Sequence, residues 1–155
     1  MGEMVSRSVV QTFYQAFASR DPLRVAPLLC DDVEWHMSGP VDIFPFCGAR
    51  RGKAAVVDYF ARLVPAVFAI KRFEPEELVI DGDRAATFTK ATAVQKATGR
   101  IITYRCAHFV TFRGGKAAAV HGIMDSYDIA EQVVGHRIDP YREPDIDTSK
   151  DVFAI

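Results

Sequence analysis

The pattern of hydrophobic and polar residues changes along the chain near position 68. Before that point apolar residues recur at helical spacing, and after it they alternate with polar residues between turns that contain Gly and Asp. The helical pattern predicts helices at about 4–19, 22–29 and 52–64, and a short one at 129–134. The alternating pattern predicts strands at about 33–38, 68–80, 85–96, 101–113 and 116–125.

Helices followed by consecutive hairpin strands predict an α+β fold, in which about three N-terminal helices pack on a strongly curved, mostly antiparallel sheet. Such a sheet is expected to enclose an apolar pocket. Residues 1–134 are predicted to form this single domain, and 39–51, which has two prolines and no periodicity, is predicted to be a long loop. Residues 135–155 are expected to form a tail packed on the surface or on a dimer partner.

Composition narrows the class of partner. The chain has 155 residues, is 49% hydrophobic and carries a formal net charge of −1, which is typical of one soluble globular domain. A balanced charge argues against nucleic-acid binding, which usually needs a basic excess. The longest uncharged apolar stretch, 63–70, is too short to cross a membrane, and we expect a cytoplasmic protein. The three cysteines are expected to be free thiols.

His108 is the first candidate for chemistry. Alternation along 101–113 puts it in the middle of the apolar face, on the side that the helices should cover. One interpretation is a core histidine whose nitrogens are hydrogen-bonded. The other is an imidazole that desolvation keeps neutral inside a pocket, where it can act as base or donor.

Four other residues are candidates for polar roles around His108. Tyr14 or Tyr104 could orient the imidazole, and Asp42 or Asp125 could supply a second polar group. Asp42 could instead be a solvated turn residue, and Asp125 could cap the short helix that follows it. Cys106 lies on the same face, but no further Cys/His spacing predicts zinc, so we expect neither a metal nor a cofactor.

Several segments of the chain resemble the SnoaL-like group of the nuclear transport factor 2-like superfamily, over about residues 5–134. The matching segments are 32–39 (DVEWHMSG), 48–56 (GARRGKAAV), 59–60 (YF), 81–84 (DGDR) and the stretch from 115–116 (GK) to 124–125 (MD). The resemblance implies a cone-shaped α+β fold with a pocket between helices and sheet, and it implies a homodimer. We expect the dimer to form through the outer sheet face, with His36, Thr103 and Arg105.

The same superfamily contains steroid delta-isomerases, limonene epoxide hydrolases and scytalone dehydratase, but their catalytic residues carry over incompletely. The oxyanion-hole Tyr of the steroid isomerases falls on Phe13, their general-base Asp on Met37 and their protonated Asp on His108. Steroid isomerisation by that mechanism is therefore not expected.

Two further groups match in part. The polyketide cyclases have a His that His108 matches, but their acidic residue on the last strand falls on Gly122. Arg105 resembles the Arg of the epoxide hydrolases, and the Asp two residues after it is Ala107 here.

We therefore expect a pocket for a small apolar or cyclic, polyketide-like molecule, with His108 as general acid or base in an isomerisation, cyclisation or hydration. Two alternatives stay open: a non-catalytic ligand-binding or dimerisation module, and an epoxide-hydrolase-like enzyme that uses Arg105 and Asp125. The residues expected to contact the ligand are Phe13, Phe17, Trp35, Met37, Phe60, Tyr104, Cys106, Val120 and Met124.

Overall fold

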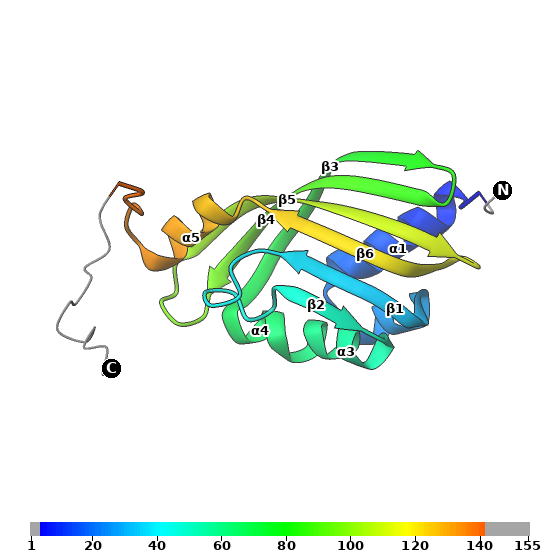
Figure 1. The fold of residues 1–155 in the computed structure, drawn as a ribbon, viewed down its shortest axis with the longest axis horizontal. Helices are drawn as coiled ribbons and strands as arrows, with labels where there is room; N and C mark the ends of the chain where they lie inside the picture. The colour runs from blue at the N-terminus through cyan, green and yellow to red at the C-terminus, as the bar shows by residue number, and fades with distance from the viewer. Residues whose placement is uncertain (1–3, 142–155) are drawn as a thin grey trace, which may run out of the picture.

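A six-stranded sheet forms the centre of the computed structural model, which describes residues 4–141 (Figure 1). Its strands are β1 (Leu29–Ser38), β2 (Gly48–Arg51), β3 (Phe68–Asp81), β4 (Arg84–Gln95), β5 (Ile101–Arg113) and β6 (Lys116–Met124). Their order across the sheet is β2-β1-β6-β5-β4-β3. Neighbours are antiparallel except β1 and β6, which run parallel. The predicted α+β fold with a mostly antiparallel sheet is confirmed, and the one parallel pair makes the sheet mixed.

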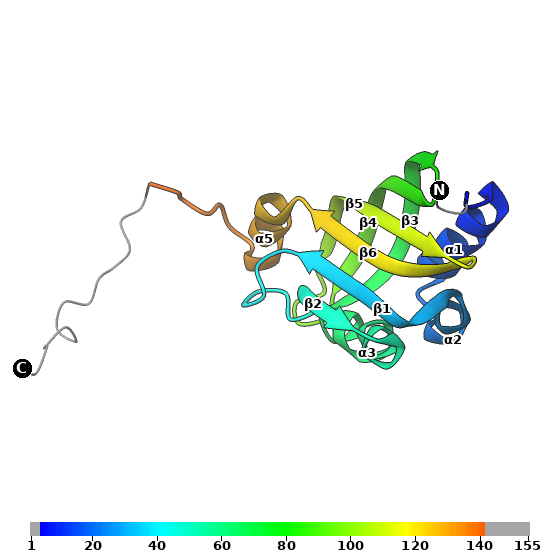
Figure 2. The same cartoon turned by 45° about the vertical axis from the view of Figure 1, so that its right-hand side comes forward.

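The helices cover one face and one end of this sheet. They are α1 (Arg7–Ser19), α2 (Pro22–Val25), α3 (Lys53–Asp58), α4 (Val64–Val67) and α5 (Ser126–Val134), with a 3₁₀ turn at Ala26–Leu28 and a π-helical turn at Tyr59–Leu63. In Figure 1, α1 lies behind the sheet. The turned view of Figure 2 shows α3 beside β2, and α5 beyond the end of β6. The face opposite α1 is therefore left without a covering layer in the described chain.

Helix α1 forms as its pattern predicts. Ser6 caps its first turn by accepting a hydrogen bond from the Val9 N–H, and Arg20 ends it in a left-handed conformation with φ 58°. The face turned to the sheet consists of apolar and aromatic residues: Val10, Phe13, Tyr14, Ala16 and Phe17. Helix α1 thus stabilises the fold through burial of one side.

The predicted loop 39–51 is wrong in its last part. Its end forms the short strand β2, which pairs with β1 at four positions, from Glu34 with Arg51 to Met37 with Gly48. A strand of four residues gives too little alternation to be recognised in a sequence. β1 also begins earlier than predicted, at Leu29, and the pattern missed this start because a register shift between Leu29 and Glu34 interrupts the alternation.

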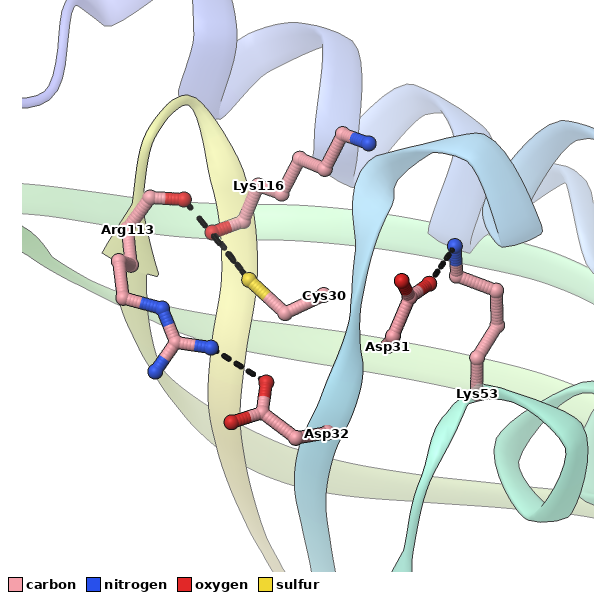
Figure 3. Close-up of polar contacts among 6 residues, drawn as sticks. All are labelled: Cys30, Asp31, Asp32, Lys53, Arg113 and Lys116. Carbon is pink, nitrogen blue, oxygen red and sulfur yellow. Dashed lines mark hydrogen bonds and ion pairs between the residues drawn. The ribbon is translucent and has the colours of Figure 1, made fainter.

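Two exposed ion pairs link the start of β1 to neighbouring segments (Figure 3). Asp31 forms an ion pair with Lys53 at 2.6 Å, and Asp32 forms one with Arg113. Cys30 points to the carbonyl oxygens of Arg113 and Lys116, its sulfur lying 3.8 and 3.9 Å away. Because both carboxylates are largely exposed, these pairs contribute little to stability and have a structural role.

The first residues of the tail are hydrogen-bonded to α5. The Tyr127 hydroxyl donates to the Ile138 carbonyl at 2.6 Å, and the Ile138 N–H donates to Glu131 at 2.8 Å. Residues 142–155, which make up most of the predicted tail 135–155, lie outside the described residues. Within residues 4–141, none of the helices combines the length and the apolar character that a membrane crossing requires.

Candidate active site

His108 lies in the middle of β5, between Thr87 on β4 and Gly122 on β6. Burial along β5 alternates residue by residue, so the even positions face the helices as predicted. The His108 side chain is 2% exposed, and its Nδ1 atom is buried without a hydrogen-bond partner. An unpaired buried nitrogen destabilises a fold, so this arrangement is not that of a satisfied core histidine.

A small cavity lies against the imidazole. Its volume is about 20 Å³, which is room for one water molecule. The lining consists of aromatic, apolar and sulfur-containing residues with a single cation: Arg20, Met37, Phe46, Tyr59, Val64, Phe73, Tyr104, Cys106, His108 and Met124. A ring-sized ligand therefore enters only if some of these side chains move.

Gly122 explains how the imidazole and Met37 fit side by side. A Cβ atom at this position would lie 3.0 Å from the His108 ring and closer still to the Met37 sulfur. The space that a side chain on β6 would occupy is thus taken by these two neighbours. A side chain at Gly122 would therefore require Met37 and the imidazole to shift.

Aromatic rings surround the imidazole and the cation together. The ring centroid of Phe17 lies 4.7 Å from that of His108, and the centroid of Phe73 lies 6.1 Å away. The Arg20 guanidinium lies 5.0 Å from the Phe17 ring and 4.7 Å from the Phe60 ring. These distances are typical of cation–π contacts and put Arg20 within the same cluster as His108.

Burial sets the protonation of the cavity residues. Burial first, and then the Arg20 guanidinium, lowers the pKa of His108 to about 3. Burial raises the pKa of Cys106 to about 12, and it raises the pKa of both Tyr59 and Tyr104. At neutral pH the cavity therefore contains a neutral imidazole, neutral phenols and a neutral thiol, with Arg20 as the charged group.

The structure brings about half of the predicted ligand-contacting residues to this cavity. Met37, Tyr104, Cys106 and Met124 line it, and Phe17 packs against the His108 ring. The others are buried in the core around the cavity and do not line it: Phe13, Trp35, Phe60 and Val120.

The three other predicted polar residues do not meet the imidazole. The Tyr14 hydroxyl donates to the backbone carbonyl of His108 at 3.5 Å, and burial raises the pKa of its phenol to about 12. Asp42 is exposed in the segment between β1 and β2. Asp125 is exposed and accepts a hydrogen bond from the Asp128 N–H at the start of α5. It therefore caps this helix, as one of its two interpretations predicted.

Arg20 is the functional candidate that the sequence patterns missed. It follows a predicted helix, outside any periodic segment, so hydrophobic patterning assigns it no direction. Tyr59, Phe46 and Phe73 were missed as well, because their directions depend on a π-helical turn, a loop and the bulged strand β3. A cation at a helix end where Gly or Asn is usual was the one available signal for Arg20.

A larger groove of about 510 Å³ lies on the outer face of the sheet. His36 and His121 meet there from β1 and β6, with ring centroids 4.8 Å apart, and the His121 Nε2 is 3.0 Å from the Ser38 hydroxyl. Phe109 lines the same groove and is 52% exposed. Both histidines thus face away from the His108 cavity, and across residues 4–141 no group of three or more His, Cys, Asp or Glu residues could hold a metal ion.

Comparison with known proteins agrees with this geometry. A family model described as "SnoaL-like domain" matches residues 10–120, most of the chain. The chain belongs to the SnoaL-like family. No curated protein matches it. Among solved structures, this SnoaL-like chain is similar to a putative isomerase from Rhodopseudomonas palustris, at 31% identity over 82% of this chain and 93% of that one, with a TM-score of 0.72.

Two other solved structures extend the comparison. TerC, co-crystallised with polyporic acid, is 26% identical over 82% of this SnoaL-like chain and 96% of its own, with a TM-score of 0.72. An epoxide hydrolase from M. tuberculosis, similar to limonene epoxide hydrolase, is 15% identical over 83% of this chain and 88% of its own, with a TM-score of 0.65. The last likeness shows the fold alone. Solved structures with this fold thus carry different names, and the fold does not select an activity.

Proposed function

We propose that this SnoaL-like protein is an enzyme that binds a small cyclic or polyketide-like molecule in the His108 cavity and moves a proton on it. The reaction class is isomerisation, cyclisation or hydration without a cofactor, with His108 as the general acid or base. The likeness to a putative isomerase and to TerC, which was crystallised with polyporic acid, supports a ring-containing ligand.

One observation carries the proposal, namely the unpartnered Nδ1 of a fully buried imidazole beside a cavity. Buried polar groups are usually hydrogen-bonded, and an unpaired titratable group that lines a cavity is a candidate for binding a ligand. The surrounding rings exclude water, and a neutral imidazole can accept a proton from carbon or oxygen, or donate one to oxygen. Because burial lowers the pKa of His108 to about 3, the imidazole becomes an effective base only when a ligand changes its surroundings.

The epoxide-hydrolase-like alternative requires Arg105 and Asp125 to meet in the cavity, and they do not. Arg105 lies on the outer sheet face, where it pairs with Glu76 at 3.0 Å, and Asp125 caps α5. Neither side chain lines the His108 cavity. The likeness to an epoxide hydrolase therefore does not extend to this pair of residues.

The experiment is proton exchange on a panel of ring compounds. Cyclic ketones, cyclic enones, polyporic acid and limonene oxide are incubated with the protein in D₂O, and deuterium uptake and products are measured by mass spectrometry. We expect exchange or turnover of at least one cyclic ketone or enone, reduced by about 100-fold or more in His108→Gln. His136→Gln, an exposed histidine, is the control and should behave as wild type. Equal rates in wild type and His108→Gln would refute the proposal.

A non-catalytic binding module is the second candidate, and one observation favours it. No carboxylate lines the cavity, so the imidazole has no acidic partner of the kind that acid–base enzymes use to orient it. This candidate predicts that a ring compound binds at His108 and that neither deuterium nor product appears. The same panel, analysed for binding and for exchange, therefore separates the two functions.

A further inference from the structure

We propose that Arg20 is the anion-binding residue of the His108 cavity, and that the ligand is a small ring compound with one acidic group, a carboxylate or an acidic enol. This inference rests on the function proposed above and names the substrate class of that site. Neither the sequence patterns nor the family resemblance assigned a role to Arg20.

The first argument is charge. Among the residues that line the cavity, Arg20 is the only cation, and the lining contains no Asp, Glu or Lys. None of the ion pairs between described residues includes Arg20. A half-buried guanidinium with five donors and no carboxylate partner is suited to bind a planar anion through two hydrogen bonds.

The second argument is the backbone at Arg20. Its φ of 58° makes it the only residue other than glycine with a positive φ among residues 4–141. Glycine adopts this helix-ending conformation without steric cost, and asparagine tolerates it better than arginine does. The unfavourable backbone conformation points to a role for the arginine side chain, which reaches the rings of Phe17, Phe60 and Phe73.

The third argument is the His108 imidazole, a second polar group at the same cavity. His108 lines the same cavity as Arg20, and its buried Nδ1 has no hydrogen-bond partner in the protein. A ring compound could therefore place its acidic group on Arg20 and a second polar atom at the imidazole. The rings of Phe17 and Phe73, which contact both Arg20 and His108, would pack on the body of such a ligand.

Binding of an anion would also activate the imidazole. Burial lowers the pKa of His108 most, and the Arg20 charge lowers it further by opposing protonation of the imidazole. A carboxylate paired with Arg20 cancels that charge, so the ligand itself would make His108 a stronger base. The acidic group would thus serve recognition and catalysis together.

The test compares benzoate with benzyl alcohol, a neutral compound of the same ring size. Dissociation constants are measured by ligand-detected NMR for wild type, Arg20→Gln, Arg20→Gly and Arg24→Gln. Arg24 is an exposed arginine on α2, so its variant makes the same change in net charge away from the cavity. Arg20→Gly removes the side chain and suits the left-handed backbone, which keeps a folded variant in the set.

We expect wild type to bind benzoate at least about tenfold more tightly than benzyl alcohol, as one charge-assisted hydrogen bond allows. Both Arg20 variants should lose this preference and keep their affinity for benzyl alcohol, and Arg24→Gln should match wild type. Equal affinity for the two compounds in wild type, or unchanged benzoate binding in Arg20→Gln, would overturn the anion assignment and leave the proposed function standing. Failure of both compounds to bind also overturns the assignment, and the deuterium experiment then decides whether the proposed function fails with it.

Discussion

Replacement of His108 by leucine is expected to stabilise the protein. Leucine has a similar size, and it removes the buried Nδ1 that has no hydrogen-bond partner. Such an unpaired group costs about 1–3 kcal/mol of folding free energy, so the unfolding free energy of His108→Leu at pH 7.5 should rise by about that amount. If His108 serves catalysis, its removal should not lower the stability of the fold. If it serves the structure, its removal should lower the unfolding free energy.

The same variant should also remove part of the acid sensitivity. The pKa of His108 is about 3 in the folded protein, against 6.5 for an unperturbed histidine, so between these values the unfolded chain binds the proton and the folded chain does not. The unfolding free energy of wild type therefore falls as the pH falls below 6.5. Between pH 7.5 and pH 4.5, the loss attributable to His108 is about 3 kcal/mol.

The assay is urea unfolding followed by the fluorescence of Trp35, the only tryptophan, which is 1% exposed and stacks on Phe17. Wild type, His108→Leu and the control His136→Leu are compared at pH 7.5 and 4.5. The control concerns an exposed histidine and should change either value by less than about 0.5 kcal/mol. The reasoning is refuted if His108→Leu unfolds more easily than wild type at pH 7.5 and shows the same loss on acidification.

Three further results are expected. Gly122→Ala should lower the unfolding free energy by about 1–3 kcal/mol, because its Cβ would overlap Met37. The double variant with Met37→Ala should lose less than the sum of the two single losses, and additive losses in thermal unfolding would contradict this. The protein should run as a homodimer in light scattering and Phe109→Glu, on the exposed outer face, should run near the 17.2 kDa of one chain; a wild-type monomer would exclude the dimer. Asp125→Ala should lose about 1 kcal/mol through the missing cap of α5, and unchanged urea unfolding would show that the cap is dispensable.

Strand positions were predictable because alternation is a local property. The pattern of β5 gave both its bounds, Ile101–Arg113, and the inward direction of His108. Spacing also predicted the end of α1 at Ser19, but the helix begins at Arg7, after the cap at Ser6, and not at about residue 4. Where one residue follows another in a regular element, the sequence determines which face each side chain takes.

The cavity lining was predictable only in part, because it depends on contacts between distant segments. Whether Met37 or Trp35 reaches the cavity is decided by how β1 pairs with β6, a parallel pairing of strands far apart in the chain. Arg20 reaches it because of a left-handed residue at the end of α1, and Tyr59 because of a π-helical turn. None of these features has a periodic signature, and so each required the folded structure.

The most direct test of the site uses the four histidines as reporters. Long-range ¹H–¹⁵N spectra of the imidazole rings are recorded during a titration with benzoate. His108 reports on the inner cavity, His36 and His121 on the outer groove, and His136 on exposed chain beyond α5. A ligand in the inner cavity predicts saturable shifts of the His108 nitrogens and none at the other rings. Shifts confined to His36 and His121 would place the binding site in the outer groove and contradict the role of His108.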